Sequence, residues 1–596
     1  MATGIGWLRR WFDEYVAGAH LIALPEQKTI KGRKLVWRGE PFTASDPLAA
    51  WQGLLKVRGV HESDPFFSPK LSGLPDPDAM QDMERAAGRV TQAVLNREHI
   101  HVFGDFDADG VSGTAILTEA LKAAGARVTS SIPHRSDDGH GIGVEPVQEA
   151  VKAGSHLGIS VDTGTTCFEA CDEAVKLGFD LIVTDHHLPE RAPERDGSSE
   201  KLPSAFALLN PAREACGFAD RKLCGTGVGF FLLMSVWKRL REAGHEVEFD
   251  LRSLLDRVAV ATVADVMELV GVNRILVYHG LQQLNGANSI PPSVGMQALK
   301  KIAKVKKSVS VETIGFYLAP RINAAGRMRH GEEAMRMLST SDEDEAMALA
   351  ESLDETNRQR RMVEADVFKA AELKLGNSDV LAVYDEAWHA GVVGLAAGRL
   401  ARKHGRPAAV GFVTPEGQVR VSLRGRPGFH VGNLLNGCAE YLEGFGGHAG
   451  AGGGTVKADG WNGFVAAFGE AVADQSEHAG DQLTQSVDGV LELGAMHAGL
   501  AERLQRFEPV GQGNAAATWL IENVHVAENR PLKGGVVRLK VSDGAQWLDA
   551  IVFGGGAFGD ALERGNIVSL LGQLKLDEYR GNGAVQFVVE DLLISE

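Results

Sequence analysis

Short apolar runs alternate with amphipathic segments between residues 99 and 187. Each apolar run ends in polar or acidic residues, and the segments between them carry apolar residues at helical spacing. We therefore predict strands at residues 99–107, 126–133, 156–164 and 180–187, separated by helices at residues 112–125, 146–154 and 168–178. Strands that alternate with short helices are typical of βαβ units, so this region should form a mostly parallel sheet.

The pattern changes after this region. Residues 188–204 are rich in proline, serine and charge, which predicts a loop, and residues 225–338 are mainly helical in pattern. Residues 341–376 predict one long helix that starts at a capping-box-like Ser341 and Asp344 and stops at a glycine. Its charged surface and thin apolar stripe favour a solvated helix that joins two lobes.

The C-terminal part of the chain predicts two further domains. Residues 379–475 repeat the α/β pattern and include a glycine-rich stretch. Beyond them, alternation around Asp543-Gly544 and within residues 567–593 predicts a small antiparallel barrel. The predicted domains are residues 1–95 (an N-terminal cap), 96–340 (the parallel-sheet domain), 341–376 (the connecting helix), 377–480 (the second α/β domain) and 488–596 (the barrel).

Length and composition predict a cytoplasmic multidomain protein. A chain of 596 residues is too long for one hydrophobic core, and 44% hydrophobic with 23% charged residues is ordinary for globular domains. No apolar stretch approaches the roughly 20 residues that span a bilayer, and the N-terminus lacks a secretory apolar segment. Five irregularly spaced cysteines fit a reducing compartment. Cys167 and Cys171 have a spacing compatible with zinc, and small buried thiols are the alternative.

Acids and histidines follow successive predicted strands. They are Asp105, Asp107 and Asp109, then Asp162, then Asp185, His186 and His187, with a further acid at Asp265 in a helical segment. Ligands bind beyond the carboxyl ends of parallel strands, so these side chains should meet at one sheet edge. Carboxylates with imidazoles suit Mn²⁺ or Mg²⁺, and this many donors favour two ions, which suit phosphoryl chemistry. The alternative is that the acids only cap turns. The net charge of −17 argues against a general nucleic-acid coat but fits such a cluster, and it leaves room for a local basic groove.

Four of these motifs resemble those of the DHH phosphoesterase superfamily: "GDFDADG", "SVDTG", "TDHHLP" with "NPAR", and "VADVMELVGVNR". Further segments, "LAPRINAAGRM", "WHAGVVGLAAGRLARKHGRPAAV", "RPGFHVGNLLNGCAEYLEGFGGHAGAGG" and "FEPVGQGN", are similar to the RecJ family of single-strand-specific 5′→3′ DNA exonucleases. The resemblance runs in order from about residue 102 to the C-terminus. It implies an α/β protein in which a parallel-sheet DHH domain is joined by a long helix to a second α/β domain (DHHA1), followed by an antiparallel OB-type barrel.

The resemblance also implies roles for the clustered residues. The cofactors would be two divalent cations, Mn²⁺ or Mg²⁺, with Asp162 as the bridging ligand. The full set of metal ligands would be Asp107, Asp109, Asp162, His186 and Asp265. The catalytic residues would be Asp105, Asp185 and His187, with Asp185 orienting a histidine and His187 facing the scissile phosphate.

Contacts to the 5′-phosphate and to DNA are implied at Arg135, Arg321, Arg327, His389, Ser422, Arg424 and His448. Arginine suits a phosphate because its fork donates two parallel hydrogen bonds. Each position has a structural alternative: the arginines can pair with acids, the histidines can be core residues, and the glycine-rich run can serve close packing. Trp388 is expected in the core. The family usually has small residues around Arg424, where this chain has Val421, Leu423 and Gly425.

The OB-type barrel implied at the C-terminus should bind single strands through a basic groove and stacked aromatic side chains. The basic candidates are Arg538, Lys540, Lys575 and Arg580. The aromatic candidates are Trp547, Tyr579 and Phe553, and the last of these is expected in the barrel core.

Together these features predict a monomeric exonuclease that degrades single-stranded DNA from its 5′ end to mononucleotides in recombination and repair. One alternative is another DHH phosphodiesterase or pyrophosphatase that acts on small phosphate substrates, which the β-rich C-terminal domain argues against. The other is a non-catalytic DHH-like scaffold for replication proteins, which the complete ligand set argues against. The resemblance further implies a single-strand-binding protein and a RecQ-type helicase as partners, and we expect no membrane association.

Overall fold

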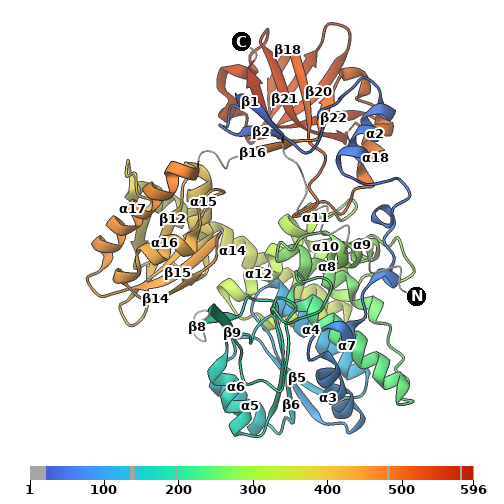
Figure 1. Cartoon of the computed structure of the whole chain (residues 1–596), viewed down its shortest axis with the longest axis vertical. Coiled ribbons are helices and arrows are strands. Elements are labelled where there is room, and N and C mark those ends of the chain that lie inside the picture. The colour runs from blue at the N-terminus through green and yellow to red at the C-terminus, as the bar shows by residue number, and fades with distance from the viewer. Residues whose placement is uncertain (1–21, 134–140, 195–196, 480–483, 578–579, 595–596) are drawn as a thin grey trace.

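The computed structural model describes residues 22–133, 141–194, 197–479, 484–577 and 580–594. Three lobes are visible in Figure 1: the parallel-sheet domain at the bottom, the second α/β domain at the left and the barrel at the top. No helix in these ranges is both long enough and apolar enough to cross a membrane.

The parallel sheet has five strands in the order β10-β7-β6-β4-β5. They are β4 (His99–Phe103), β5 (Arg127–Ser131), β6 (Leu157–Val161), β7 (Asp180–Thr184) and β10 (Ala207–Leu209). Separate hydrophobic cores lie on its two faces. One core is covered by α3 (Met83–Leu95), α4 (Ala108–Ala123) and α7 (Gly225–Glu242), and the other by α5 (Val144–Lys152) and α6 (Phe168–Lys176). This burial on both faces explains the continuous apolar runs of the strands and confirms the predicted parallel sheet.

Two local predictions differ from the structure. Helix α4 begins at Ala108, inside the acidic motif, because Asp107 is its N-cap. The loop predicted for residues 188–204 is wrong: β8 (Glu190–Glu194) and β9 (Gly197–Lys201) pair as an antiparallel hairpin. Among the described residues these strands pair only with each other, and Glu190 also forms an ion pair with Lys201, so the hairpin does not join a larger sheet.

A helical layer follows the sheet and shares a core with α4. It consists of α8 (Leu255–Ala264), α9 (Gly271–Leu284), α10 (Val294–Ile302), α11 (Val311–Thr313), the π-helix η5 (Ile314–Leu318), α12 (Ala319–Met328) and α13 (Glu332–Ser339). The long helix α14 (Glu343–Leu375) then leads to the second α/β domain, ending at Gly376 as predicted. Its cap is Asp342, whose side chain accepts from the Glu345 amide at 2.8 Å, and not the predicted Ser341.

The second α/β domain contains a mixed sheet in the order β11-β12-β13-β15-β14. Its strands are β11 (Ala382–Asp385), β12 (Ala408–Val413), β13 (Val419–Arg424), β14 (Leu442–Gly447) and β15 (Ala451–Val456). Its helices are α15 (Ala390–His404), α16 (Val431–Gly437) and α17 (Trp461–Ala479). The glycines of β15 lie against the backbones of β13 and β14, which is the close-packing alternative for the glycine-rich run.

The barrel is closed by pairing of β18 (Trp519–Pro531) with β19 (Val537–Ser542). Its other strands are β20 (Trp547–Val552), β21 (Ile567–Leu576) and β22 (Val585–Ile594), and β20 and β22 pair in parallel. Strands β16 (Thr484–Val487) and β17 (Gly489–Leu491) and helix α18 (Ala498–Gln505) precede it. The OB-type barrel predicted at the C-terminus is therefore present.

The N-terminal segment contributes to the barrel's core. Its elements are β1 (Ile22–Lys28), β2 (Lys34–Trp37), β3 (Thr43–Ala44) and α2 (Pro47–Val57). Strand β2 pairs with β16, and β3 pairs with β17. Trp51 and Leu54 of α2 are buried in one cluster with barrel residues such as Trp519. A buried ion pair of 2.6 Å between Arg58 and Asp488 joins the two segments.

Candidate metal centre and its surroundings

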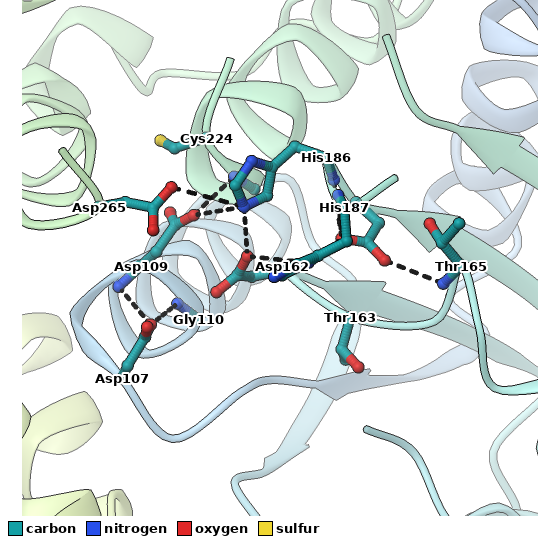
Figure 2. Close-up of polar contacts among 12 residues, drawn as sticks. Asp107, Asp109, Gly110, Asp162, Thr163, Thr165, His186, His187, Cys224 and Asp265 are labelled. Carbon is teal, nitrogen blue, oxygen red and sulfur yellow. Dashed lines mark hydrogen bonds and ion pairs between the residues drawn. The ribbon is translucent and has the colours of Figure 1, made fainter. Parts of the chain in front are cut away.

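The acidic motif after β4 is also the start of a helix. Oδ1 of Asp107 accepts hydrogen bonds from the backbone amides of Asp109 at 2.9 Å and Gly110 at 3.2 Å. This cap places Asp109 in the first turn of α4. The alternating acids therefore lie apart, with Asp107 at the loop and the buried Asp109 above it in Figure 2.

The N-terminus of α7 holds the Asp109 carboxylate. Its two oxygens accept from the amides of Gly225 at 2.6 Å and Thr226 at 2.8 Å. The positive end of a helix dipole stabilises a carboxylate placed there. A Cβ at Gly225 would lie 2.5 Å from Cα of Asp162, so glycine lets α7 approach both acids. Sequence reasoning missed this contact, although the Cys-Gly-Thr-Gly run at residues 224–227, where α7 starts, was a readable signal.

Ligand atoms from three other segments converge on His186. Its Nε2 lies 3.1 Å from Oδ1 of Asp162, 3.5 Å from Oδ2 of Asp265 and 3.9 Å from Oδ2 of Asp109 (Figure 2). Asp162 Oδ1, Asp265 Oδ2 and His186 Nε2 are buried and have no hydrogen-bond partner. An unpaired buried polar atom costs about 1–3 kcal/mol, so three that point at one another fit a site for a cation.

A second group shares Asp162. Asp105, Asp107 and Asp162 each offer a carboxylate oxygen, and these oxygens lie within 4.8 Å of one another. Asp162 also belongs to a group with His186 and His187. One carboxylate common to neighbouring groups is the arrangement expected of a ligand that bridges two ions.

The backbone is strained beside two of these ligands. Asp162 has φ +62° and Val266, which follows Asp265, has φ +57°. Such left-handed conformations cost non-glycine residues about 1–3 kcal/mol and persist where the surroundings impose them. Here the Asp162 amide donates to the Thr184 carbonyl at 2.9 Å, which ties the turn to β7.

Electrostatics at the centre favour a bound cation. Burial, followed by repulsion from Asp109, raises the pKa of Asp107, of Asp162 and of Asp265, the last to about 8. Burial lowers the pKa of His186. Carboxylates that repel one another in a buried site are stabilised when a divalent cation neutralises them. The donor set, carboxylate oxygens with one imidazole, suits Mn²⁺ or Mg²⁺.

Asp185 fixes the position of His187. Its buried carboxylate accepts from the amides of His186 at 2.7 Å, His187 at 3.1 Å and Thr165 at 2.9 Å, and from Nδ1 of His187 at 2.8 Å. Although burial alone would raise it, hydrogen bonding to His187 holds the pKa of Asp185 well below its usual range. The same bond raises the pKa of His187 to about 9. The His187 side chain is 60% exposed, so its ring is accessible beside the cluster.

Helix α12 lies next to the acidic motif. Oδ1 of Asn323 accepts from the Ala108 amide at 2.7 Å, a contact that sequence reasoning missed. Arg327 is close enough to lower the pKa of Asp107, against the larger effect of burial. Nη1 of Arg327 donates to the Gly391 carbonyl at 3.4 Å, which connects α12 to the start of α15. His389 caps α15 by accepting from the Gly391 amide at 3.0 Å.

The predicted end-phosphate residues lie together on the second α/β domain. The side chains of Arg424 and Ser422 cover the surface of α15 at Gly394. Burial lowers the pKa of His448, and Arg424 lowers it further, with smaller effects from His430 and His187. Arg424 therefore lies near both Ser422 and His448, and His448 is within electrostatic reach of His187.

Several predicted residues do not join the site. Arg321 pairs with Asp354 of α14 at 2.7 Å, which is the structural alternative stated for it. Trp388 is buried in the core, as expected. Cys167 accepts from the Ile142 amide and Cys171 is buried, and the metal-binding groups found among the described residues contain only aspartate and histidine. Arg135 and Tyr579 lie outside the described residues.

The barrel exposes some of its predicted DNA contacts. Trp547 is 62% exposed, and the Lys540 ammonium lies 5.1 Å from its ring centre. Arg538 and Arg580 both pair with Asp549, while Lys575 is exposed. The prediction that Phe553 belongs to the core is wrong, because it is 59% exposed. It continues the outward-facing positions of β20, whose buried residues alternate with them.

Family models match this chain over three ranges. They are the DHH family N-terminal domain at residues 99–262, the DHHA1 domain at residues 377–474 and the RecJ OB domain at residues 487–591. The single-stranded-DNA-specific exonuclease RecJ of Dickeya dadantii is 32% identical over 563 residues, covering 90% of this chain and 95% of that protein. The protein of the same name from Escherichia coli is 31% identical over 566 residues, with 90% and 95% covered.

Solved structures of RecJ proteins are also similar to this chain. The crystal structure of RecJ from Thermus thermophilus in complex with Mn²⁺ superposes with a TM-score of 0.74 at 27% identity, covering 93% of this chain and 79% of that one. A structure of exonuclease RecJ bound to manganese has a TM-score of 0.56 at 30% identity, with 67% and 97% covered. The similarity therefore extends over all three lobes.

Proposed function

The chain belongs to the RecJ family of single-stranded-DNA-specific exonucleases, and from this premise we propose that it degrades single strands from the 5′ end to 5′-mononucleotides. Within that family it is a metal-dependent single-stranded-DNA exonuclease whose cofactors are divalent cations. The observation that carries the metal-dependent chemistry is the convergence of three unpaired buried ligand atoms, from Asp162, His186 and Asp265, beside the group that Asp162 forms with Asp105 and Asp107.

Two neighbouring sets of ligands would hold the cations. Asp109, His186 and Asp265 would form one set, and Asp105 and Asp107 the other, with Asp162 shared between them. Asp105, for which the resemblance implies a catalytic role, thus offers a ligand atom as well. When bound, a pair of divalent cations supplies a water nucleophile at neutral pH and neutralises charge on the phosphate.

His187 would act on the phosphate from beside the cations. Asp185 holds its Nδ1, so Nε2 on the far side of the ring is the atom left to donate. With a pKa of about 9, the ring is protonated at neutral pH and its positive charge favours the anionic phosphate. Asp185 would keep the ring in this orientation while the strand advances.

The 5′ polarity would come from the second α/β domain. The side chains of Ser422 and Arg424 from β13 lie against α15 at Gly394, and Arg424 is near His448. A terminal phosphate bound there would be held by the forked guanidinium, and the next phosphodiester would reach the metal centre. The effect of His187 on the pKa of His448 supports this placement, because it puts His448 near the metal centre.

We further propose a cytoplasmic, monomeric enzyme that acts in recombination and repair. The barrel would hold the strand beyond the active site, using Trp547, Lys540 and Lys575. Recruitment by a single-strand-binding protein and cooperation with a RecQ-type helicase follow from the family resemblance.

Digestion of strands labelled at one end tests the proposal. With Mn²⁺, a 5′-labelled single strand should lose its label as mononucleotide at once, whereas a 3′-labelled strand should shorten progressively. Duplex DNA and EDTA-treated enzyme serve as controls. Early release of 3′-label would contradict the proposed polarity. Rapid hydrolysis of pyrophosphate or dinucleotides with intact long strands would favour the small-substrate alternative.

A further inference from the structure

One continuous helix connects the barrel's attachment to the metal centre. Elements α11, η5 and α12 follow one another without a break from residue 311 to residue 328. Near its start, Val311 and Leu269 fill the space beside Gly511, which precedes the barrel. Near its end, Asn323 bonds the acidic motif. At a rise of 1.5 Å per residue, Val311 and Asn323 are about 18 Å apart along the helix, so the helix spans the region between the barrel's attachment and the metal centre.

A π-turn in this helix presents two aromatic side chains to solvent. Pro320 has no amide hydrogen to donate to Phe316, and its ring would clash with that carbonyl in an α-helix. The π-helix at Ile314–Leu318 widens the turn at this point. Ile314 and Leu318 are buried, whereas Phe316 is 74% exposed and Tyr317 is 53% exposed. π-turns inside helices frequently occur at functional sites.

This exposure is unusual within the chain. Phe316 is the most exposed aromatic side chain in the described ranges. The other strongly exposed aromatics there are Trp547 and Phe553 on the barrel and Phe445 in the second α/β domain. Two adjacent aromatic rings that contribute little to the core have their faces available to a ligand.

A cluster of lysines directly precedes the helix. It comprises Lys300, Lys301, Lys304, Lys306 and Lys307, in a chain whose net charge is −17. Lys301, Lys304 and Lys306 are exposed. The segment is held in place because Asn285 exchanges two hydrogen bonds with the backbone of Val309, at 2.6 and 2.9 Å. The lysines thus lie within 16 positions of Phe316 in the sequence, and positive charge combined with exposed rings is what binds single-stranded nucleic acid.

We propose that Phe316 and Tyr317, together with the lysine segment (residues 300–307), form a base-stacking site for the single strand between the metal centre and the barrel. The rings take the bases, and the lysines take the phosphates. The inference rests on the proposed function and adds a binding site to it. Charge complementarity selects the occupant, because a polyanion with exposed aromatic bases matches both halves of this surface.

Abasic scanning tests the stacking. The probes are 5′-phosphorylated oligothymidylates in which one abasic residue is moved stepwise from the 5′ end, and binding is measured in Ca²⁺ by anisotropy. The parent should show a window of positions at which the abasic residue weakens binding by about tenfold, the size of one lost base stack. In Phe316→Ala/Tyr317→Ala that window should disappear while the penalties elsewhere stay. Leu373→Ala, which removes a 77% exposed side chain from α14, is the matched control and should keep the window.

The salt dependence tests the lysines. Lys304→Ala/Lys306→Ala should reduce the log–log salt slope by about 1.4, since each phosphate contact contributes about 0.7 for single strands. Lys122→Ala/Lys152→Ala changes the charge equally on α4 and α5 and should leave the slope unchanged.

If the parent degrades single strands in Mn²⁺ but Phe316→Ala/Tyr317→Ala has an unaltered abasic profile, the stacking site is overturned and the proposed function stands. A parent that fails to degrade single strands at all overturns the proposed function instead. A uniform loss of affinity at every abasic position would also overturn the stacking site, because it would show a structural effect.

Discussion

Arg274 of α9 fastens the barrel to the parallel-sheet domain, and replacing it with methionine should loosen that attachment. The buried guanidinium donates to the carbonyls of Phe66 at 3.0 Å, Phe507 at 3.0 Å, Pro509 at 3.1 Å and Glu508 at 2.9 Å. It also lies 3.7 Å from the centre of the Phe66 ring. All four carbonyls belong to segments that flank the barrel's core.

The energetic cost can be bounded from these contacts. The carbonyls of Phe507 and Pro509 keep a second donor, the Asn514 amide. Those of Phe66 and Glu508 would lose the Arg274 donor, and a buried unpaired carbonyl costs about 1–3 kcal/mol. Burial lowers the pKa of Arg274 to about 10, which shows that the charged guanidinium is buried at a desolvation cost. The uncharged methionine avoids this cost, which offsets part of the loss. We expect a net loss of about 2–4 kcal/mol at this junction.

Limited proteolysis and oligonucleotide binding together measure the effect. Arg274→Met should be cleaved faster near residues 505–515 and should bind long single strands more weakly, while Mn²⁺ binding and cleavage of very short strands stay close to the parent's. Arg252→Met removes an exposed arginine from the same domain and should match the parent. Parent-like proteolysis and long-strand affinity in Arg274→Met would refute this view of the junction.

Further predictions concern the site and the barrel. Asp185→Asn should lower kcat by about 10–100-fold, because the amide nitrogen would face the donors that Asp185 now accepts from and His187 would lose its orientation. A parent-like kcat would contradict this. Arg424→Ala should reduce the preference for 5′-phosphorylated over 5′-hydroxyl strands by about tenfold or more, measured as a kcat/KM ratio, since a charge-assisted bond of about 1.5–3 kcal/mol is lost; an unchanged ratio would place the end phosphate elsewhere. Deleting residues 488–596 should cause aggregation, seen by light scattering, because Trp51 and Leu54 lose their core; a monodisperse truncate would show that the N-terminal segment is independent.

The sequence predicted the sheet and the ligand cluster because both depend on local pattern and topology. Parallel strands end at the same edge, so acids that follow β4, β6 and β7 had to meet. The contact between Asp109 and the start of α7 was not predictable in this way, because 116 positions separate Asp109 from Gly225. Asn323 was missed for the same reason: its polar contact is made by an unremarkable residue on a distant helix.

The wrong or missing predictions outside the metal centre also have physical causes. Phe553 was expected in the core. Side chains of a strand alternate between two faces, and Phe553 follows β20 at a position that faces outward. The cap predicted at Ser341 is one residue too early, because the Asp342 side chain accepts from the Glu345 amide and caps helix α14. The N-terminal strands pair with β16 and β17, far along the chain, and their short lengths leave no clear period in the sequence.

Counting bound Mn²⁺ tests the account most directly. Isothermal titration of the parent should give two ions per chain, and Asp162→Ala should bind fewer and lose single-strand degradation, since Asp162 shares one ligand group with Asp105 and Asp107 and lies 3.1 Å from His186 of the other. Asp172→Ala, an exposed acid on α6, is the control and should bind two and cleave normally. An Asp162→Ala variant that still binds two ions and degrades single strands at the parental rate would contradict the shared metal centre.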